Sequence, residues 1–326
     1  MVQGVRESVL VSERLRTGVV GLGYFGSFHA RQHAANPTVD LVAVVDADGA
    51  RAASVAETYG AAAFTDPRAL IGRVDAVSIA VPTSWHHDIA GMLIDAGIHV
   101  LIEKPIADSL EAARDLVARA ARRDVVLQVG HIERFSPVFA ALQTKLDSPR
   151  ALDFTRIGPW KGRAVDVDVV LDLMIHDIDL ALTLAGSPVV AVAATGAALR
   201  GPTNDFAHAV LGFANGMSAH LHASRIAARQ ERSIHVVDGA RLIIADLAAR
   251  TVAWSAGHSD ARHEIAVPAS DNLALEIASF LAAVRQGRPP VVDGAAGLAA
   301  LDVAERIMRA IAGHPTIAAT NNGGSL

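Results

Sequence analysis

The sequence predicts an α/β protein of two domains: a doubly wound parallel sheet, then an α/β domain with an open, mainly antiparallel sheet. Between residues 17 and 130, short β-branched runs alternate with Ala-rich amphipathic stretches, which is the rhythm of parallel βαβ units. After residue 131, strand-like runs follow one another through turn signals such as Asn215-Gly216. The length of 326 residues also suits two domains.

Five runs of the first domain are predicted as strands buried on both faces, because polar and apolar residues scarcely alternate in them. They are 17–21, 41–46, 75–82, 98–105 and 125–130. Helices are expected between them at 25–35, 50–59, 86–96 and 110–123. Asp108 or Ser109 can cap the last of these helices. Residues 1–16 carry charges every few positions, so we expect a flexible extension rather than a signal peptide.

The second domain is expected from residue 132 to residue 326. Its predicted helices follow Pro137 or lie at 169–185, 272–286 and 295–312. Its predicted strands are 151–158, 189–199, 207–216, 217–225, 232–239, 240–250 and 251–256. Few helices are available to cover the two faces of such a sheet, and an exposed apolar face invites self-association. A homodimer or homotetramer is therefore expected.

The overall composition excludes several classes of protein. The formal net charge is −5, which argues against a surface for nucleic acid or for anionic membranes. The chain has no cysteine, so disulfides, thiolate nucleophiles and cysteine-bound metals are excluded. No run approaches the roughly 18 apolar residues of a membrane span. We predict a cytoplasmic protein whose partner is a small molecule.

A glycine-rich turn follows the first predicted strand. Gly21, Gly23 and Gly26 form a G-x-G-x-x-G pattern before a helix, and Asp46 ends the next strand. In Rossmann domains these glycines allow the tight turn, the approach of a pyrophosphate and close helix–strand packing, while the acidic residue binds the ribose hydroxyls. We therefore predict a nicotinamide dinucleotide. Asp46 would repel a 2′-phosphate and favours NAD over NADP, although Arg51 keeps NADP open.

Two further motifs carry candidate chemistry. Glu103-Lys104-Pro105 lies at the carboxyl end of a predicted parallel strand, where ligands bind in such sheets and where a lysine can stabilise an alkoxide. Asp172 and His176 are four residues apart, so on a helix they share one face, as a general base and its carboxylate partner would. The alternatives are a surface lysine and a helical ion pair. No metal is predicted, because the nearby acidic residues do not follow a calcium-loop spacing.

With these residues identified, the chain resembles the glucose-fructose oxidoreductase/inositol dehydrogenase/MocA family over nearly all of 17–312. The motifs are GLGYFG with Asp46, GIHVLIEKPIADS and LDLMIHDIDLAL. The resemblance implies a Rossmann domain that binds NAD, at 17–131, and a domain for substrate and oligomerisation, at 132–326. It also implies that hydride is transferred from a sugar or polyol carbon. The implied catalytic residues are Lys104, Asp172 and His176, with His176 as the base.

Two stretches, VGHIERFSPVFAAL and DVDVVLDLMIHDIDLAL, are similar to the UDP-N-acetylglucosamine 3-dehydrogenase branch of that family. That branch supplies a 3-keto nucleotide sugar for amination, and the amino sugar serves lipid A or related glycans. The glycine pair that the wider family carries before D-x-x-x-H is replaced by Asp168-Val169-Val170, which weakens a transfer from the inositol dehydrogenases. An inositol or free-sugar dehydrogenase and a non-catalytic NAD-binding sensor are the alternatives.

The predicted binding residues fall into two sets. The cofactor set is Gly21, Gly23, Tyr24, Phe25, Gly26, Asp46, Pro82, His86, Glu103 and Lys104. Simple packing explains His86 equally well. The substrate set, whose cations suit a diphosphate, is Lys104, Arg134, Arg156, Lys161, Arg163, Asp172 and His176. The nearby aspartates are numerous enough to neutralise all of these cations instead.

Overall fold

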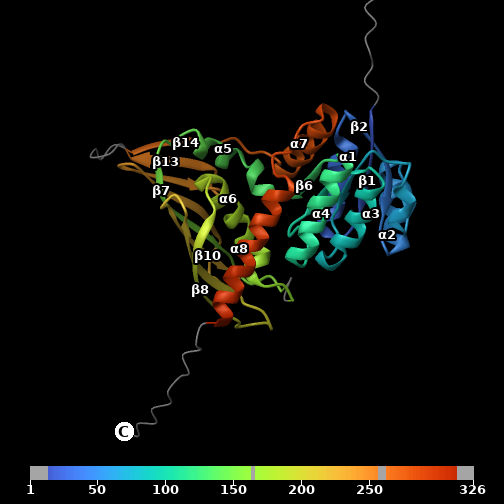
Figure 1. The fold of residues 1–326 in the computed structure, drawn as a ribbon. Helices are drawn as coiled ribbons and strands as arrows, with labels where there is room; N and C mark the ends of the chain where they lie inside the picture. The colour runs from blue at the N-terminus through green and yellow to red at the C-terminus, as the bar shows by residue number, and fades with distance from the viewer. Residues whose placement is uncertain (1–13, 163–165, 256–261, 314–326) are drawn as a thin grey trace, which may run out of the picture. The chain divides into compact units, whose positions relative to one another are not determined.

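The computed structural model describes residues 14–162, 166–255 and 262–313. The chain divides into two compact units, one made of 1–130 and 273–293 and the other of 131–272 and 294–326. The first unit holds a parallel sheet and the second a mainly antiparallel sheet, each with helices (Figure 1). The predicted α/β class, with one sheet of each kind, is therefore confirmed.

These units differ from the expected domains in one respect. The first long segment ends at Gly130, close to the expected boundary, but the helix expected at 272–286 packs in the first unit. Sequence order alone does not reveal which core a returning helix joins. The expected extension, 1–16, lies outside the described residues up to position 13, and Leu15 already begins a strand.

The first unit is built on six short parallel strands. Their bounds are β1 Leu15–Val20, β2 Val39–Val45, β3 Ala62–Phe64, β4 Ala76–Ile79, β5 His99–Glu103 and β6 Leu127–Gly130. In space their order is β3, β2, β1, β4, β5, β6, which is that of a doubly wound sheet. The strand order reverses between β1 and β4, so their carboxyl ends frame a crevice where ligands bind in such sheets.

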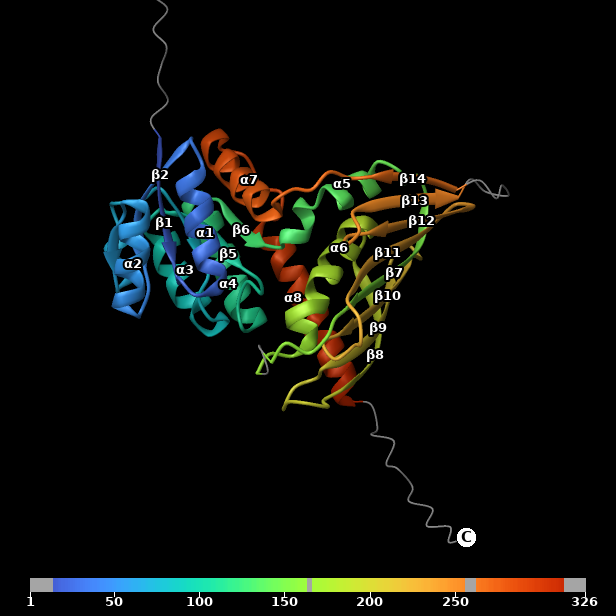
Figure 2. The same ribbon diagram turned by 180° about the vertical axis from the view of Figure 1, so that it is seen from behind.

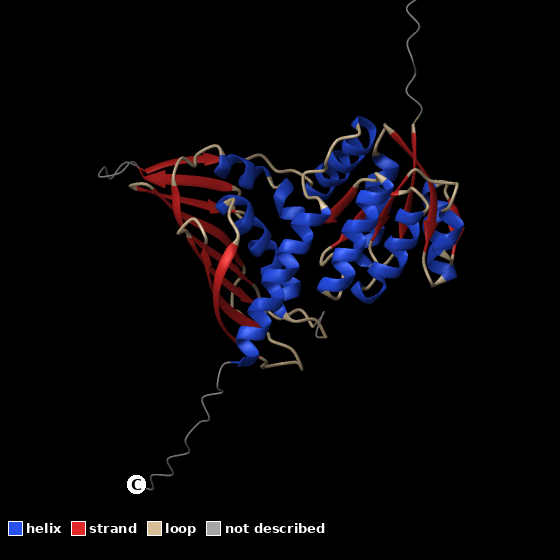
Figure 3. Cartoon of the chain, viewed as in Figure 1, coloured by secondary structure: helices blue, strands red, loops and turns tan. Residues whose placement is uncertain are grey.

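Helices and 3-10 turns connect these strands (Figure 3). They are α1 Tyr24–Ala35, α2 Gly49–Tyr59, η1 Pro67–Leu70, η2 Thr83–Trp85, α3 His86–Asp95 and α4 Leu110–Arg123. The side chain of Asp48 caps α2 and that of Ser109 caps α4. By contrast, α1 begins after Gly23 without a side-chain cap. The first N–H groups of α1 are thus not occupied by a capping side chain, as an anion-binding helix start requires.

The helix α7, Asn272–Gln286, comes late in the sequence but belongs to the first unit and lies beside β6. The N–H of Val129 donates to the carbonyl of Val292 at 3.0 Å, and the carboxamide of Gln128 donates to the carbonyl of Glu276 at 3.2 Å. The side chain of Glu276 is completely buried. Burial first, and the charge of Glu103 second, raise the pKa of Glu276 well above its ordinary value. This environment therefore disfavours the charged form of Glu276.

Eight strands form the sheet of the second unit. They are β7 Pro149–Ile157, β8 Val189–Ala197, β9 Phe206–Phe213, β10 Ser218–Ser224, β11 Glu231–Asp238, β12 Arg241–Asp246, β13 Thr251–Ser255 and β14 Arg262–Ala266. Their spatial order is β14, β13, β12, β11, β7, β10, β9, β8. Among these described strands β7 and β10 are parallel neighbours, and the other neighbouring pairs are antiparallel.

Helical segments cover one face of this sheet. They are η3 Ile132–Phe135, α5 Pro137–Gln143, η4 Val170–Met174, α6 Ile175–Ala185 and α8 Gly294–Gly313. Figures 1 and 2 show α5, α6 and α8 on the same side. Phe139, Phe154, Leu221 and Ile307 are at most 1% exposed between these layers, and each such side chain contributes about 1.5–3 kcal/mol through burial. The core of the second unit lies here.

The opposite face of the sheet carries no helix of this unit among the described residues (Figure 2). On that face Val210, Val237 and Leu242 are each at least 40% exposed, and the rings of His208 and His222 lie 4.5 Å apart between centroids. Such a face is suited to self-association, and the oligomeric state stays a prediction. Among the described helices, none is long and apolar enough to cross a membrane.

Candidate active site

The turn between β1 and α1 requires its glycines for different reasons. Gly21 has a φ of +84°, and a Cβ there would lie 2.6 Å from the carbonyl oxygen of Ala80. A Cβ on Gly26 would lie 1.7 Å from the carbonyl oxygen of Gly21. Around a Cβ on Gly23, by contrast, no heavy atom of the described residues would lie within 4 Å. This open space beside the uncapped start of α1 fits the pyrophosphate of a dinucleotide.

A pocket opens at this carboxyl edge of the parallel sheet. The predicted cofactor residues that line it are Gly21, Gly23, Asp46 and Pro82. Arg51 of α2, which the sequence analysis considered for NADP, also lines it. Lining residues that the sequence did not indicate include Thr65, Arg68, Trp85 and Met92. They come from the loop after β3, from η1 and from the η2–α3 region, which no short motif marks. Two other predicted contacts, Tyr24 and Phe25, are half or more exposed at the start of α1.

Asp46 stands directly after β2 and lines this pocket. Its carboxylate accepts hydrogen bonds from the N–H of Leu22 at 2.7 Å and of Asp48 at 2.8 Å. The guanidinium of Arg51 donates to its two oxygens at 3.1 and 3.2 Å. Burial opposes ionisation, but these bonds outweigh it and hold the pKa of Asp46 below its ordinary value. A carboxylate, paired with one cation, therefore faces the expected position of the adenosine ribose.

Lys104 follows β5 at the same edge of the sheet and is partly buried. Just before it, the carboxylate of Glu103 lies 2.9 Å from Nε2 of His29, a buried residue of α1. Burial would raise the pKa of Glu103, but the hydrogen bond from His29 and the charges of His29 and Lys104 lower it overall. Lys104 is thus held next to a carboxylate.

His86 is completely buried at the start of α3. Its two ring nitrogens lie 2.9 Å from the carbonyl of Pro105 and 3.0 Å from that of Val81. Burial lowers the pKa of His86 and outweighs the two carbonyls, which favour the protonated ring. The packing explanation accounts for these contacts, and His86 is not part of the pocket lining described above.

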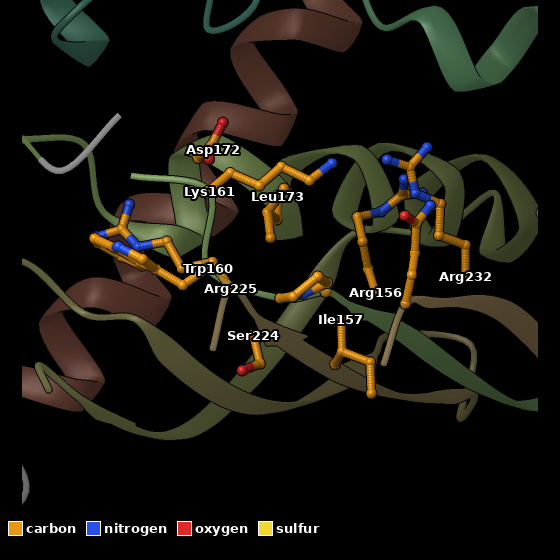
Figure 4. A pocket seen from close by; sticks show the side chains of 12 residues that line it. Arg156, Ile157, Trp160, Lys161, Asp172, Leu173, Ser224, Arg225 and Arg232 are labelled. Atoms are coloured by element: carbon orange, nitrogen blue, oxygen red, sulfur yellow. The ribbon is translucent and has the colours of Figure 1, made fainter. Parts of the chain in front are cut away.

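The second unit has a pocket where the parallel neighbours β7 and β10 end (Figure 4). The predicted substrate residues that line it are Arg156, Lys161 and Asp172. Trp160, Arg225 and Arg232 also line it and were not predicted. The carboxyl ends of parallel strands meet at one edge, which explains why residues far apart in sequence gather here.

The segment that carries Asp172 and His176 is not the uninterrupted α-helix that was predicted. Val170–Met174 form a π-helical turn, and α6 begins at Ile175. A π turn holds more residues than an α turn, so a spacing of four does not by itself place both side chains on one face. Asp172 lines the pocket, and the ring of His176 lies edge-on to that of His131 at 6.4 Å between centroids. Turns of this kind are frequent at functional sites.

Two of the predicted substrate arginines are engaged in buried ion pairs. Arg156, 3% exposed, donates to Asp177 at 2.7–3.0 Å and to Glu133 at 2.6 Å. Burial opposes the charge of Arg156, but the two carboxylates raise its pKa above the ordinary value. Arg134 pairs with Asp179 at 2.8 Å. Carboxylates therefore neutralise both arginines in this structure, which is the alternative to phosphate binding that the sequence left open.

The remaining predicted cations differ in their surroundings. Lys161 is exposed, and no carboxylate of the described residues pairs with it. Arg163 lies outside the described residues. The catalytic set itself is divided, because Lys104 belongs to the first unit while Asp172 and His176 belong to the second.

Comparisons with known proteins identify the family to which both parts of the chain are similar. Residues 15–131 match the oxidoreductase family with an NAD-binding Rossmann fold, and residues 140–244 match the GFO/IDH/MocA C-terminal domain. The UDP-N-acetylglucosamine 3-dehydrogenase of Acidithiobacillus ferrooxidans is 39% identical over 91% of this chain and 97% of that protein. A crystal form of that enzyme superposes with a TM-score of 0.87 at 38% identity, covering 92% of this chain and 98% of the other. The inositol 2-dehydrogenase of Rhizobium meliloti is 31% identical over 91% and 97% of the two chains.

Proposed function

Because the chain belongs to the GFO/IDH/MocA family of NAD-binding oxidoreductases, we propose that it oxidises a secondary hydroxyl of a nucleotide sugar. The substrate we propose is UDP-N-acetylglucosamine, oxidised at C3 to the 3-keto sugar. One observation supports this choice most: the pocket of the second unit places Asp172 together with several cationic side chains, an environment for a sugar that carries a diphosphate. Inositol carries no anionic group for these cations to neutralise.

The nicotinamide ring, when bound, accepts the hydride from the sugar carbon. The role that we propose for His176 is to take the proton of the reacting hydroxyl, as a general base near neutral pH does. Lys104 hydrogen-bonds the same oxygen and stabilises the developing alkoxide. Asp172 lines the substrate pocket and orients the sugar or the imidazole.

For the cofactor we propose NAD rather than NADP. The ionised Asp46 supports this preference, because a second negative charge on the adenosine ribose would approach a carboxylate. The open space at Gly23 admits the pyrophosphate, and Arg51 tempers the preference by neutralising part of the charge of Asp46. The other proposed contacts are those of the predicted set: Gly21, Tyr24, Phe25, Gly26, Pro82, Glu103 and Lys104. His86 is proposed to support them through the backbone carbonyls of Val81 and Pro105.

For the substrate we propose direct contacts from Lys104, Lys161, Asp172 and His176. Arg163 remains in the proposed set from its sequence position. Arg156 lines the pocket and is engaged with carboxylates, so it is proposed to act on the substrate through the wall that it forms. Arg134, which pairs with Asp179, remains in the proposed set from its sequence position.

The test is to measure NADH formation and UDP-sugar binding for the wild type and for His176→Ala and Lys104→Ala. We expect each variant to lose about a hundred- to ten-thousand-fold in kcat, and we expect His176→Ala to retain its affinity for NAD. His263→Ala, an exposed position on β14, is the matched control. Near-normal turnover of His176→Ala would exclude the role of base.

A second candidate, an inositol or free-sugar dehydrogenase, is supported by the similarity to the Rhizobium meliloti inositol 2-dehydrogenase. The same assay separates the two candidates when it includes free inositol and free N-acetylglucosamine. Oxidation of inositol without any oxidation of UDP-sugars would establish the second candidate and reject the first.

A further inference from the structure

The pocket of the second unit brings four cationic side chains to one edge of the sheet. Arg156 lies near the end of β7, Lys161 follows that strand, Arg225 follows β10, and Arg232 lies near the start of β11. Among the described lining residues, the one carboxylate is that of Asp172. Four cations around one pocket favour an anionic ligand. The question is which of the four can meet it.

Two of these cations are already committed to buried partners. Arg156 is enclosed by Asp177 and Glu133, as described above. Arg225, 6% exposed, donates to Asp205 and to the carbonyl of Val167, each at 2.7 Å. Removing either guanidinium from its partners would leave a buried carboxylate without a counter-charge, which is costly. Both arginines therefore act as fixed walls of the pocket.

The other two cations are much more exposed. Arg232 stands opposite Arg156 across β7 and β11, and like charges at such positions repel each other. Both reach the same oxygen of Glu133, Arg156 at 2.6 Å and Arg232 at only 3.8 Å, beyond hydrogen-bond distance. The side chain of Arg232 is also 43% exposed. Lys161 is exposed, and Figure 4 shows its ammonium group directed toward the side of the pocket where Arg232 lies.

The ring of Trp160 forms the wall beside Lys161, and two arginines contact this ring. The guanidinium groups of Arg225 and Arg200 lie 5.6 and 5.8 Å from the ring centroid of Trp160, a range in which cation–π attraction acts. Because Arg225 is itself anchored by Asp205, Trp160 is held in place before a ligand arrives. The segment that carries Lys161 therefore starts from an ordered residue.

We propose that Lys161 and Arg232 clamp the diphosphate of a nucleoside diphosphate sugar, with the sugar directed toward Asp172. This inference rests on the proposed function and adds Arg232, which no motif indicated, as the residue that distinguishes a nucleotide sugar from a free sugar. The fork of Arg232 binds phosphate oxygens in pairs, and Lys161 adds a mobile point charge.

The test measures UDP binding by calorimetry and the kinetics of UDP-N-acetylglucosamine oxidation. Arg232→Gln and Lys161→Gln should each weaken UDP binding about ten- to hundred-fold and raise KM more than they lower kcat. Arg232→Lys should restore part of the loss. The matched control is Arg229→Gln, since Arg229 is 79% exposed and pairs with Glu231 outside the pocket. The control should bind UDP as the wild type does.

If Arg232→Gln folds normally by circular dichroism and binds UDP like Arg229→Gln, the clamp is overturned while the proposed function stands. If Arg232→Gln does not fold, Lys161→Gln and the salt dependence of UDP binding decide, because loss of a phosphate contact reduces that dependence. A salt dependence equal to that of the wild type would overturn the clamp. If the wild type oxidises free sugars and does not bind UDP, the proposed function fails together with it.

Discussion

The cofactor edge of the first unit and the pocket of the second unit are both suited to anions, but they are built differently. At the cofactor edge the decisive features belong to the backbone. Gly21 has a positive φ, Gly26 approaches the carbonyl of Gly21 so closely that no side chain fits, and α1 begins without a side-chain cap. In the pocket they are charged side chains in ion pairs, such as Arg156 with Glu133. A site of the first kind is encoded within a few residues, whereas one of the second kind exists only after distant segments meet.

The largest effect is expected from the ion pairs of the second unit. Arg156→Gln leaves Asp177 and Glu133 buried without their main counter-charge, so we expect a loss of about 3–5 kcal/mol of unfolding free energy. Chemical denaturation measures it. The control is Arg262→Gln, whose exposed pair with Glu264 should matter little. A loss of unfolding free energy no larger than that of the control would mean that the second unit does not depend on these ion pairs for its stability.

The glycine turn offers the next test, now for backbone geometry. Gly26→Ala places a methyl group against the carbonyl of Gly21, and we expect a loss of about 3 kcal/mol together with the loss of NAD binding. Gly23→Ala meets no described atom, so its stability should be nearly unchanged. NAD binding should nevertheless weaken in Gly23→Ala, because the methyl group occupies the proposed place of the pyrophosphate. Thermal unfolding and NAD titration separate the two effects, and equal destabilisation of both variants would contradict this account.

Much of the first unit followed from local signals. The sequence predicts the helix Leu110–Arg123 with its observed bounds, because a capping Ser109 and an amphipathic pattern define it. The strand β3 was missed because three residues are too few to show a strand pattern, and β14 was missed because it is mostly polar. The π turn at Val170–Met174 was also missed, because its residue pattern suits an α-helix equally well.

The two candidate sites also differed in how many of their residues the sequence could predict. Gly21, Gly23 and Asp46 could be selected because each role follows from a short motif. Arg232 could not be selected, since its place beside Arg156 depends on the pairing of β7 with β11. The same holds for the contact of His29 with Glu103, which joins residues 74 positions apart.

The first unit also contains a buried ionisable side chain, so its stability depends on charge as well as on backbone geometry. His33 on α1 is completely buried against Ser78, and burial first, then the charge of His29, lower its pKa to about 3. Because the unfolded chain protonates near 6.5 and the folded one near 3, stability is complete above pH 6.5 and is lost as the pH falls toward 3. Between pH 7.5 and pH 5 this amounts to about 2 kcal/mol.

His33→Gln should remove this dependence, so that the difference in unfolding free energy from the wild type shrinks as the pH falls. The exposed His263→Gln is the control. Parallel pH profiles of His33→Gln and the wild type between pH 7.5 and 5 would show that His33 does not titrate as described.

The smallest effect is expected for the choice between NAD and NADP, which depends on the ion pair of Asp46 with Arg51 at the cofactor edge. Asp46→Ala should weaken NAD binding about tenfold and narrow its advantage over NADP, because the repulsion of a 2′-phosphate is removed while Arg51 is released. Arg51→Gln should widen that advantage instead. Fluorescence titration of both nucleotides measures it, and equal affinities of the wild type for NAD and NADP would exclude Asp46 as a selector.

The central claim is that this chain moves a hydride from C3 of UDP-N-acetylglucosamine to NAD. The most direct test incubates the enzyme with NAD and UDP-N-acetylglucosamine that carries deuterium on C3, and analyses the reduced nucleotide by mass spectrometry. We predict that the reduced nucleotide gains the deuterium and that a 3-keto sugar forms in equal amount. Reduced nucleotide without deuterium, or no reduction with this sugar while a free polyol is oxidised, would contradict the account.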